Sequence, residues 1–96
     1  MEINVYHQRE KGRFLTVVKG REAFMKYTKP DKEVLEITST FIPAELRGQG
    51  IACQIAEFAC HYAQAKNLKI KPSCPYLAQF IENNPEVYQI VQTVDA

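Results

Sequence analysis

The stretch Leu46-Arg47-Gly48-Gln49-Gly50-Ile51-Ala52 joins a segment typical of a β-strand, residues 33–42, to a segment typical of a helix that reaches about residue 67. Glycine adopts positive φ and has no Cβ, so two glycines one residue apart allow the backbone to approach a ligand closely. The first N–H groups of the helix lack partners and carry the positive end of its dipole. The stretch therefore predicts a cradle for a phosphate or pyrophosphate group.

An ordinary tight turn is the alternative interpretation, because short glycine motifs often occur by chance. Two of only four glycines in the chain lie in this turn, and Arg47 directly precedes the first of them. No Gly-Lys-Ser/Thr follows, which excludes a P-loop, and Cys53 replaces the third glycine of a dinucleotide-binding Gly-x-Gly-x-x-Gly fingerprint. These features favour a phosphate-bearing ligand but do not identify it.

Length and composition predict one small domain, 1–96, that can bury a core, since 46% of the residues are apolar and the net charge is +1. Cations are interleaved with acids, which argues against nucleic acid or a membrane surface as a partner. No run is long enough to span a bilayer, and residues 1–4 do not resemble a signal peptide. Three cysteines without a Cys-x-x-Cys pair predict a reducing, cytoplasmic setting and no metal site.

Strand-like segments separated by turn residues precede the glycine stretch. They cover residues 3–6, 12–18, 22–28 and 34–42, with turns expected at residues 19–20 and 29–32. In the helix that follows, Ile51, Ile55, Phe58 and Tyr62 fall on one stripe, so we expect Phe58 to be buried against the sheet. A neighbouring stripe of alanines permits close packing, and Cys53 and Cys60 on the same helix are expected in the core.

A short strand at residues 69–71, a helix at 76–83 and a helix or turn at 85–88 complete the order β-β-β-β-α-β-α. This order predicts an α+β fold, an α/β sandwich whose mostly antiparallel sheet contains one parallel β-α-β step. That step should be a right-handed crossover.

Two segments carry a family resemblance. Arg47-Gly48-Gln49-Gly50-Ile51-Ala52 follows a strand and opens a helix, and Lys71-Pro72-Ser73-Cys74-Pro75-Tyr76 follows the next strand. Together with residues 84–88 they resemble a minimal single-domain branch of the GNAT superfamily of N-acetyltransferases. In that superfamily the Gln/Arg-x-x-Gly-x-Gly/Ala loop binds the pyrophosphate of acetyl-CoA.

The resemblance implies a GNAT-like fold with acetyl-CoA as the cofactor. Its pantetheine arm would lie between the fourth and fifth strands, and a backbone N–H would polarise the thioester oxygen. The residues expected to bind the cofactor are Phe41, Ile42, Arg47, Gly48, Gln49, Gly50, Ile51 and Ala52.

Candidate catalytic residues each have a structural alternative. Cys74 stands before a helix, where a thiol is a stronger nucleophile and could carry the acetyl group, but a cysteine there could equally pack beside the cofactor. Tyr76 and Tyr88 could protonate the departing thiolate or form the edge of the core. Glu36 could deprotonate an amine or belong to a solvated strand face.

The histidines offer a weaker signal. Relatives usually carry a His-Thr pair before the loop, where this chain has Ser39-Thr40, so a base on that histidine is absent. His7 is expected to be exposed, and His61 to be exposed or half-buried.

The sequence predicts an acetyl-CoA-dependent N-acetyltransferase that acts on an amine of a small molecule or protein, as a monomer or homodimer. A non-catalytic module that binds or senses acyl-CoA is the alternative, supported by the absent histidine and the reduced acceptor side.

Overall fold

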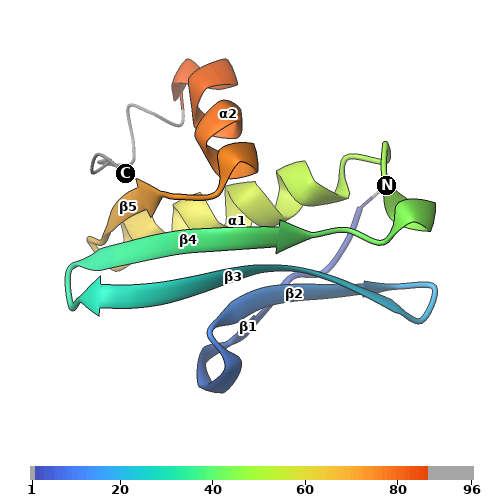
Figure 1. Ribbon diagram of the computed structural model, residues 1–96, viewed down its shortest axis with the longest axis horizontal. Helices are drawn as coiled ribbons and strands as arrows, with labels where there is room; N and C mark the ends of the chain where they lie inside the picture. The colour runs from blue at the N-terminus through green and yellow to red at the C-terminus, as the bar shows by residue number, and fades with distance from the viewer. Residues whose placement is uncertain (1, 87–96) are drawn as a thin grey trace.

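The computed structural model describes residues 2–86, which form one five-stranded sheet and two α-helices (Figure 1). The elements in chain order are β1 (Tyr6–Gln8), the 3-10 helix η1 (Arg9–Lys11), β2 (Arg13–Val18), β3 (Arg21–Asp31), β4 (Val34–Phe41), the 3-10 helix η2 (Ala44–Leu46), α1 (Ile51–Ala65), β5 (Lys69–Pro72) and α2 (Pro75–Asn83).

The sheet has the strand order β1-β2-β3-β4-β5. The first three pairings are antiparallel, and β4 pairs with β5 in parallel through α1. Lys19 and Gly20, both at positive φ, form the two-residue turn between β2 and β3, a geometry that suits the twist of a hairpin. The α+β prediction, with its single parallel step, is confirmed.

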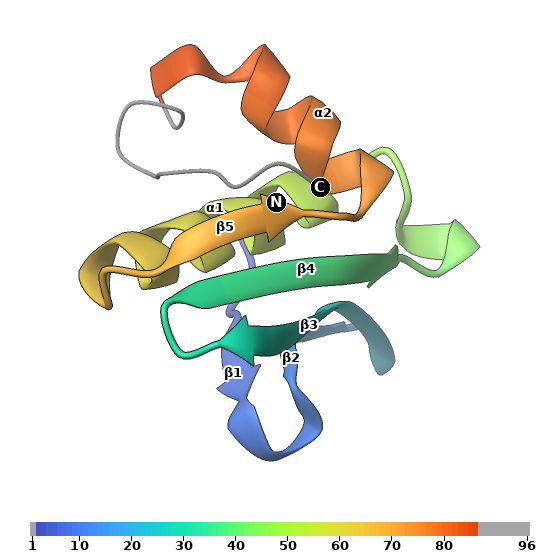
Figure 2. The same ribbon diagram turned by 60° about the vertical axis from the view of Figure 1, so that its left-hand side comes forward.

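The core lies between the sheet and the helices. The helix α1 packs across β2, β3 and β5, and α2 packs against α1 and β5 at the edge of the sheet (Figure 2). Fully buried side chains from the strands, including Phe14, Met25 and Leu35, meet the alanine stripe of α1.

The innermost residues of α1 differ from the expected stripe. Ala56, Ala59 and Ala63 are fully buried because their small side chains let the helix approach the sheet closely. Phe58, expected to be buried against the sheet, packs against the core but is only partly buried, and its ring meets the edge of the Phe14 ring with centroids 5.7 Å apart.

Strand boundaries also differ from the sequence expectation. The first strand is Tyr6–Gln8, because the segment before it is held by side chains: Ile3 N donates to Gln54 Oε1 at 3.2 Å, and Thr16 Oγ1 donates to Asn4 O at 2.7 Å.

The turn expected at residues 29–32 is part of β3, which runs to Asp31. Pro30 falls where the β3–β4 register shifts, so its missing N–H costs no regular ladder bond. The turn comes after it, where Asp31 Oδ1 accepts from Glu33 N at 3.0 Å. The helix α1 ends at Ala65, two residues early, and Asn67 has a left-handed φ of 56°. The helix or turn expected at 85–88 extends outside the described residues.

An irregularity in β4 positions the candidate site. Lys26 lies opposite Ser39 and Tyr27 lies opposite Ile37, so Thr38 is an extra residue in β4. Such a bulge shifts the alternation of side chains. As a result Thr40 lies opposite the buried Met25, on the face that α1 covers.

The parallel pairing of β4 with β5 ends where Ile37 lies opposite Pro72, and Cys74 N then donates to Ile37 O at 2.9 Å. Beyond that bond the chain turns into α2, whereas β4 continues to Phe41 (Figure 2). Within residues 2–86, the last four residues of β4 therefore have no strand partner on the side of β5.

Candidate active site

The glycine stretch forms the turn between β4 and the N-terminus of α1. Gly48 and Gly50 have φ of 78° and 76°, values that other residues rarely adopt. A Cβ added at either position would meet nothing within 4 Å, so both glycines border open space. The conformation of the turn, and not packing within the chain, therefore requires glycine here.

The first turn of α1 supplies hydrogen-bond donors to that space. Gly50 is the N-cap residue, and no side chain caps the helix. The N–H groups of Ile51, Ala52 and Cys53 occupy the positions that lack acceptors within a helix. A positively polarised helix end with open access suits an anionic group.

Two polar side chains fix the shape of the turn. Arg47 Nε donates to Ile42 O at 3.1 Å, and Gln49 Nε2 donates to Glu45 O at 3.1 Å. Arg47 is exposed, so its terminal nitrogens remain available beside Gly48. The carbonyl of Ile42, expected to contact pantetheine, already accepts one bond.

A hollow of about 540 Å³ lies between this turn, the end of β4 and the start of α2; we call it the loop hollow. The residues predicted from sequence that line it are Ile42, Arg47, Gly48, Gly50, Ile51, Ala52 and Tyr76. The structure thus gathers most of the predicted cofactor residues with one predicted catalytic residue. Phe41, Gln49, Cys74 and Glu36 are not in its lining.

Cys74 lies immediately beneath the loop hollow. It is the N-cap residue of α2, its side chain is 4% exposed, and its Sγ is 3.1 Å from Thr40 Oγ1. Thr40 lines the hollow, so the sulfur contacts a lining residue without lining the hollow itself. The Cys74 thiol is therefore adjacent to the hollow but is not part of its lining.

Tyr76 presents its hydroxyl to the loop hollow. The hydroxyl lies 3.3 Å from Cys53 Sγ, and the residue is 37% exposed. Burial, and secondarily the hydrogen bond with Cys53, raises the pKa of Tyr76 well above its usual value. Like an unperturbed tyrosine, Tyr76 is protonated at neutral pH and can act as a donor, and its raised pKa makes it a weaker acid than an unperturbed tyrosine.

Cys53 and Thr40 line the hollow but were not predicted from sequence. Cys53 was expected in the core with Cys60, and that expectation is wrong for Cys53, which is exposed. Cys60 is buried, and burial raises its pKa to about 12. The spacing of the two cysteines does not show which one is exposed. Cys53 is exposed because it lies in the first turn of α1, which borders the loop hollow.

Glu36 and Phe41 lie on the opposite face of the sheet from the loop hollow. Their neighbours Ile37 and Thr40 face α1, and alternation turns Glu36 and Phe41 outward. Glu36 Oε2 accepts from Ser73 Oγ at 2.5 Å, next to the point where β4 and β5 part. The Phe41 ring is 48% exposed.

The histidines lie away from the loop hollow. His7, expected to be exposed, is partly buried among the rings of Phe14, Tyr27 and Tyr62, so that expectation is wrong. Its Nε2 is hydrogen-bonded to the Tyr27 hydroxyl. Burial, and then the charge of Arg9, lowers the pKa of His7. His61 is exposed, as expected.

Residues 2–86 contain neither a metal-binding cluster nor a membrane-spanning helix. No group of three or more His, Cys, Asp or Glu side chains in that range is arranged to hold a metal ion. No helix in the same range has the length and apolar character needed to cross a bilayer.

A mixed sheet with a glycine turn leading from a central strand into a helix, beside two parallel strands that part, defines an N-acetyltransferase fold. Residues 13–91 match the family described as GCN5-related N-acetyl-transferase, and the chain belongs to that family.

The chain is also similar to curated proteins and to a solved structure. Protein NATD1 of Gallus gallus and that of Mus musculus are each 28% identical over 85 residues, which span 86% of this chain and 77% of the relative. The solution structure of a GCN5-like protein from Staphylococcus aureus superposes with a TM-score of 0.74 at 20% identity, covering 95% of this chain and 89% of that one. That similarity concerns the fold.

Proposed function

We propose that the chain transfers an acetyl group from acetyl-CoA to an amine of a small molecule or protein, with acetyl-CoA bound in the loop hollow. The observation that carries this proposal is the uncapped N-terminus of α1, whose free amides and two positive-φ glycines face open space. Its position beside the unpaired end of β4 gives an extended ligand a second set of backbone partners.

The residues present fit such a ligand. The amides from Gly48 to Ala52 would bind the pyrophosphate, and Arg47 would add a positive charge. The end of β4 would pair with the amide groups of pantetheine as a strand pairs with its neighbour. When bound, acetyl-CoA supplies an activated acetyl thioester close to Thr40 and Tyr76.

Acid and base roles follow from the two faces of the sheet. Tyr76, kept protonated, would donate its proton to the departing thiolate on the α1 face. Glu36 stands on the other face beside the parting of β4 and β5, where it could take a proton from an incoming amine directly or through water. The acceptor would therefore approach from the face opposite the loop hollow.

The role of Cys74 has two versions. In the covalent version its thiolate attacks the thioester carbonyl, the carbon–sulfur bond to CoA breaks, and the amine later displaces Cys74. In the direct version the amine attacks and Cys74 only packs against Thr40. Its low exposure and its absence from the lining of the loop hollow favour the direct version.

The proposal is tested by melting curves with acetyl-CoA or CoA, followed by CoA release upon addition of amines. We expect stabilisation by both ligands and CoA release with at least one amine. Stabilisation without release across small amines and lysine peptides would instead support an acyl-CoA sensor. An unchanged melting temperature would reject both.

Mass spectrometry after incubation with acetyl-CoA alone distinguishes the two versions for Cys74. The direct version predicts no acetyl adduct and near-complete acetyl transfer by Cys74→Ser. An adduct at Cys74 that hydroxylamine removes, together with an inactive Cys74→Ser variant, would establish the covalent version. The buried Cys60 serves as the unmodified control.

A further inference from the structure

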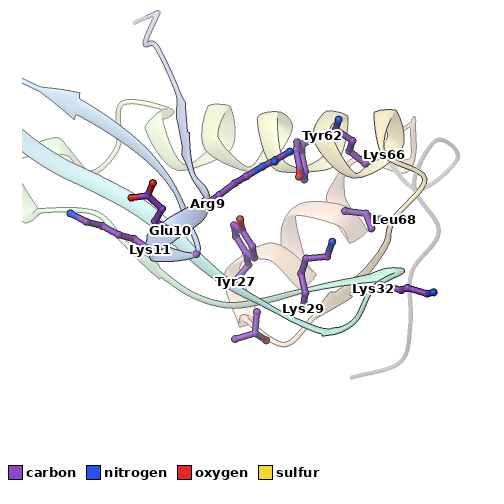
Figure 3. Close-up of a pocket in the computed structure, with 11 residues that line it drawn as sticks. Arg9, Glu10, Lys11, Tyr27, Lys29, Lys32, Tyr62, Lys66 and Leu68 are labelled. Carbon is purple, nitrogen blue, oxygen red and sulfur yellow. The ribbon is translucent and has the colours of Figure 1, made fainter.

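A second hollow, of about 760 Å³, lies at the other end of α1 (Figure 3). Its walls come from three separate segments: η1 and the residue after it, the end of β3, and the last turn of α1 with the loop that follows. We call it the basic hollow. It shares no lining residue with the loop hollow.

The charge of the lining is strongly one-sided. The ionised side chains around the basic hollow are Arg9, Glu10, Lys11, Lys29, Lys32 and Lys66, five cations and one carboxylate. The whole chain has a net charge of only +1. Cations are therefore concentrated here, and like charges held close together repel each other.

The orientations of these side chains divide them into two sets. Arg9 extends toward Tyr62, Lys29 points into the same space, and Lys66, directly after α1, lies beside Tyr62 (Figure 3). Lys11 and Lys32 point away from the hollow. Arg9, Lys29 and Lys66 make no ion pair and no side-chain hydrogen bond with any other residue in the range 2–86.

Tyr27 and Tyr62 line the hollow between these cations. Both belong to the ring cluster around Phe14, with centroids at 5.0 and 5.7 Å from the Phe14 ring, so a rigid core holds them. The hollow thus combines fixed aromatic surfaces with cations that have no ion-pair partner among residues 2–86.

A favourable interaction with the helix dipole explains only one of the three cations Arg9, Lys29 and Lys66. Lys66 follows the last turn of α1, where a cation interacts favourably with the helix dipole. That reason does not apply to Arg9 or Lys29, which come from η1 and β3. A stripe for nucleic acid would spread along a surface, whereas these side chains converge on one concavity.

The basic hollow is too distant to belong to the acetyl-CoA site. The 15 residues of α1 span about 22 Å, and the glycine turn lies at the opposite end. A small molecule bound at one end cannot contact the reacting atoms at the other.

We propose that the basic hollow binds a small phosphate-bearing molecule, separately from acetyl-CoA. Arg9 and Lys29 would hold the phosphate with assistance from Lys66, because charge-assisted bonds to phosphate oxygens are the strong ones. The rings of Tyr27 and Tyr62 would pack against the remainder of the molecule. The volume of the hollow falls in the range of small-molecule sites, about 300–1,000 Å³.

Amide and side-chain NMR shifts during titration with adenosine monophosphate test the proposal, with CoA at saturation so that the glycine turn is occupied. We expect shifts at Lys29, Tyr62 and Lys66. Adenosine, which lacks the phosphate, should bind at least about tenfold more weakly.

Charge-matched variants provide the control. Lys29→Gln and Arg9→Gln should each weaken binding by about tenfold, whereas Lys11→Gln and Lys32→Gln should change it less than about threefold. Without ligand and at low salt, Lys29→Gln should raise the melting temperature, because it removes repulsion among the cations that line the basic hollow.

Three outcomes would overturn the proposal. Equal losses for Lys29→Gln and Lys32→Gln would indicate diffuse attraction without a site. Shifts confined to the glycine turn would place all phosphate binding there. Binding of an aspartate-rich peptide in preference to the nucleotide would make the hollow a protein-docking surface.

Discussion

The two ends of α1 carry hollows built on opposite principles. At the N-terminal end, the loop hollow depends on backbone: free amides, two positive-φ glycines and an unpaired strand edge. At the C-terminal end, the basic hollow depends on side chains from three segments that converge in space. Backbone sites require glycine at fixed positions, so they leave a compact sequence motif, whereas convergent side chains leave none.

The largest expected effect on stability comes from Phe14, the core residue against which Tyr27 and Tyr62 of the basic hollow pack. Phe14 is fully buried and contacts the rings of Tyr27, Phe58 and Tyr62. Phe14→Ala should lower the free energy of unfolding by about 3–5 kcal/mol, measured by urea denaturation. Val17→Ala, at an exposed position of the same strand β2, serves as the control. A loss below about 1 kcal/mol would mean that the ring cluster does not anchor α1.

Next in size is the contribution of Tyr76 at the loop hollow. Tyr76→Phe keeps the ring and removes the proton donor, so kcat should fall by about a hundredfold while CoA affinity changes little. Steady-state kinetics with calorimetry of CoA binding would separate the two effects. An unchanged kcat would assign protonation of the thiolate to another group or to water.

A smaller effect tests whether the glycine turn is a backbone site. Gly50→Val should weaken CoA binding by about tenfold, or about 1.4 kcal/mol, since a branched side chain would occupy the space beside the free amides. Gly20→Val is a matched control, because Gly20 has the same φ of 76° and also borders open space. If both variants bind CoA equally well, the cradle assignment is wrong.

The smallest effect concerns His7, beside the basic hollow. Burial, then Arg9, lowers its pKa in the folded state, so the unfolded chain binds this proton more readily. Stability should therefore fall as the pH drops below about 6.5, the usual value for histidine, and through the lowered pKa. Urea midpoints between about pH 7.5 and pH 5.5 should move less for His7→Gln than for the unmodified chain. Equal slopes would show that His7 does not contribute.

Local sequence signals predicted the fold well. The turn at Lys19–Gly20, the apolar periodicity of α1 and the β-α-β order were sufficient for the strand order and the parallel step. Errors arose where tertiary contacts overrode local preference. Pro30 looked like a turn residue, but a register shift accommodates it within β3. His7 looked exposed because its ring partners come from distant segments.

The site was predictable only in part, for the same reason. The glycines at positions 48 and 50 predict a turn with positive φ from the sequence, and both have positive φ and line the loop hollow. Cys53 and Thr40 carry no such signal, because their access to the hollow depends on the start of α1 and on the bulge in β4. The position of Arg9 near Tyr62 also has no sequence signal, because it depends on η1, the end of β3 and the end of α1 folding together.

Because Thr38 is an extra residue in β4, the number of residues in this strand decides which side chains face α1, as much as their identity does. If β4 kept Thr38 but paired with β3 without the bulge, strict alternation would turn Ser39 and Phe41 toward α1 and Thr40 outward. Deleting Thr38 would instead remove the bulge and leave Thr40 opposite Met25, on the face it occupies now. No residue of the glycine turn would be altered by this deletion. An alignment gap at Thr38 would thus keep Thr40 and Phe41 matched to residues on their own sides of the sheet.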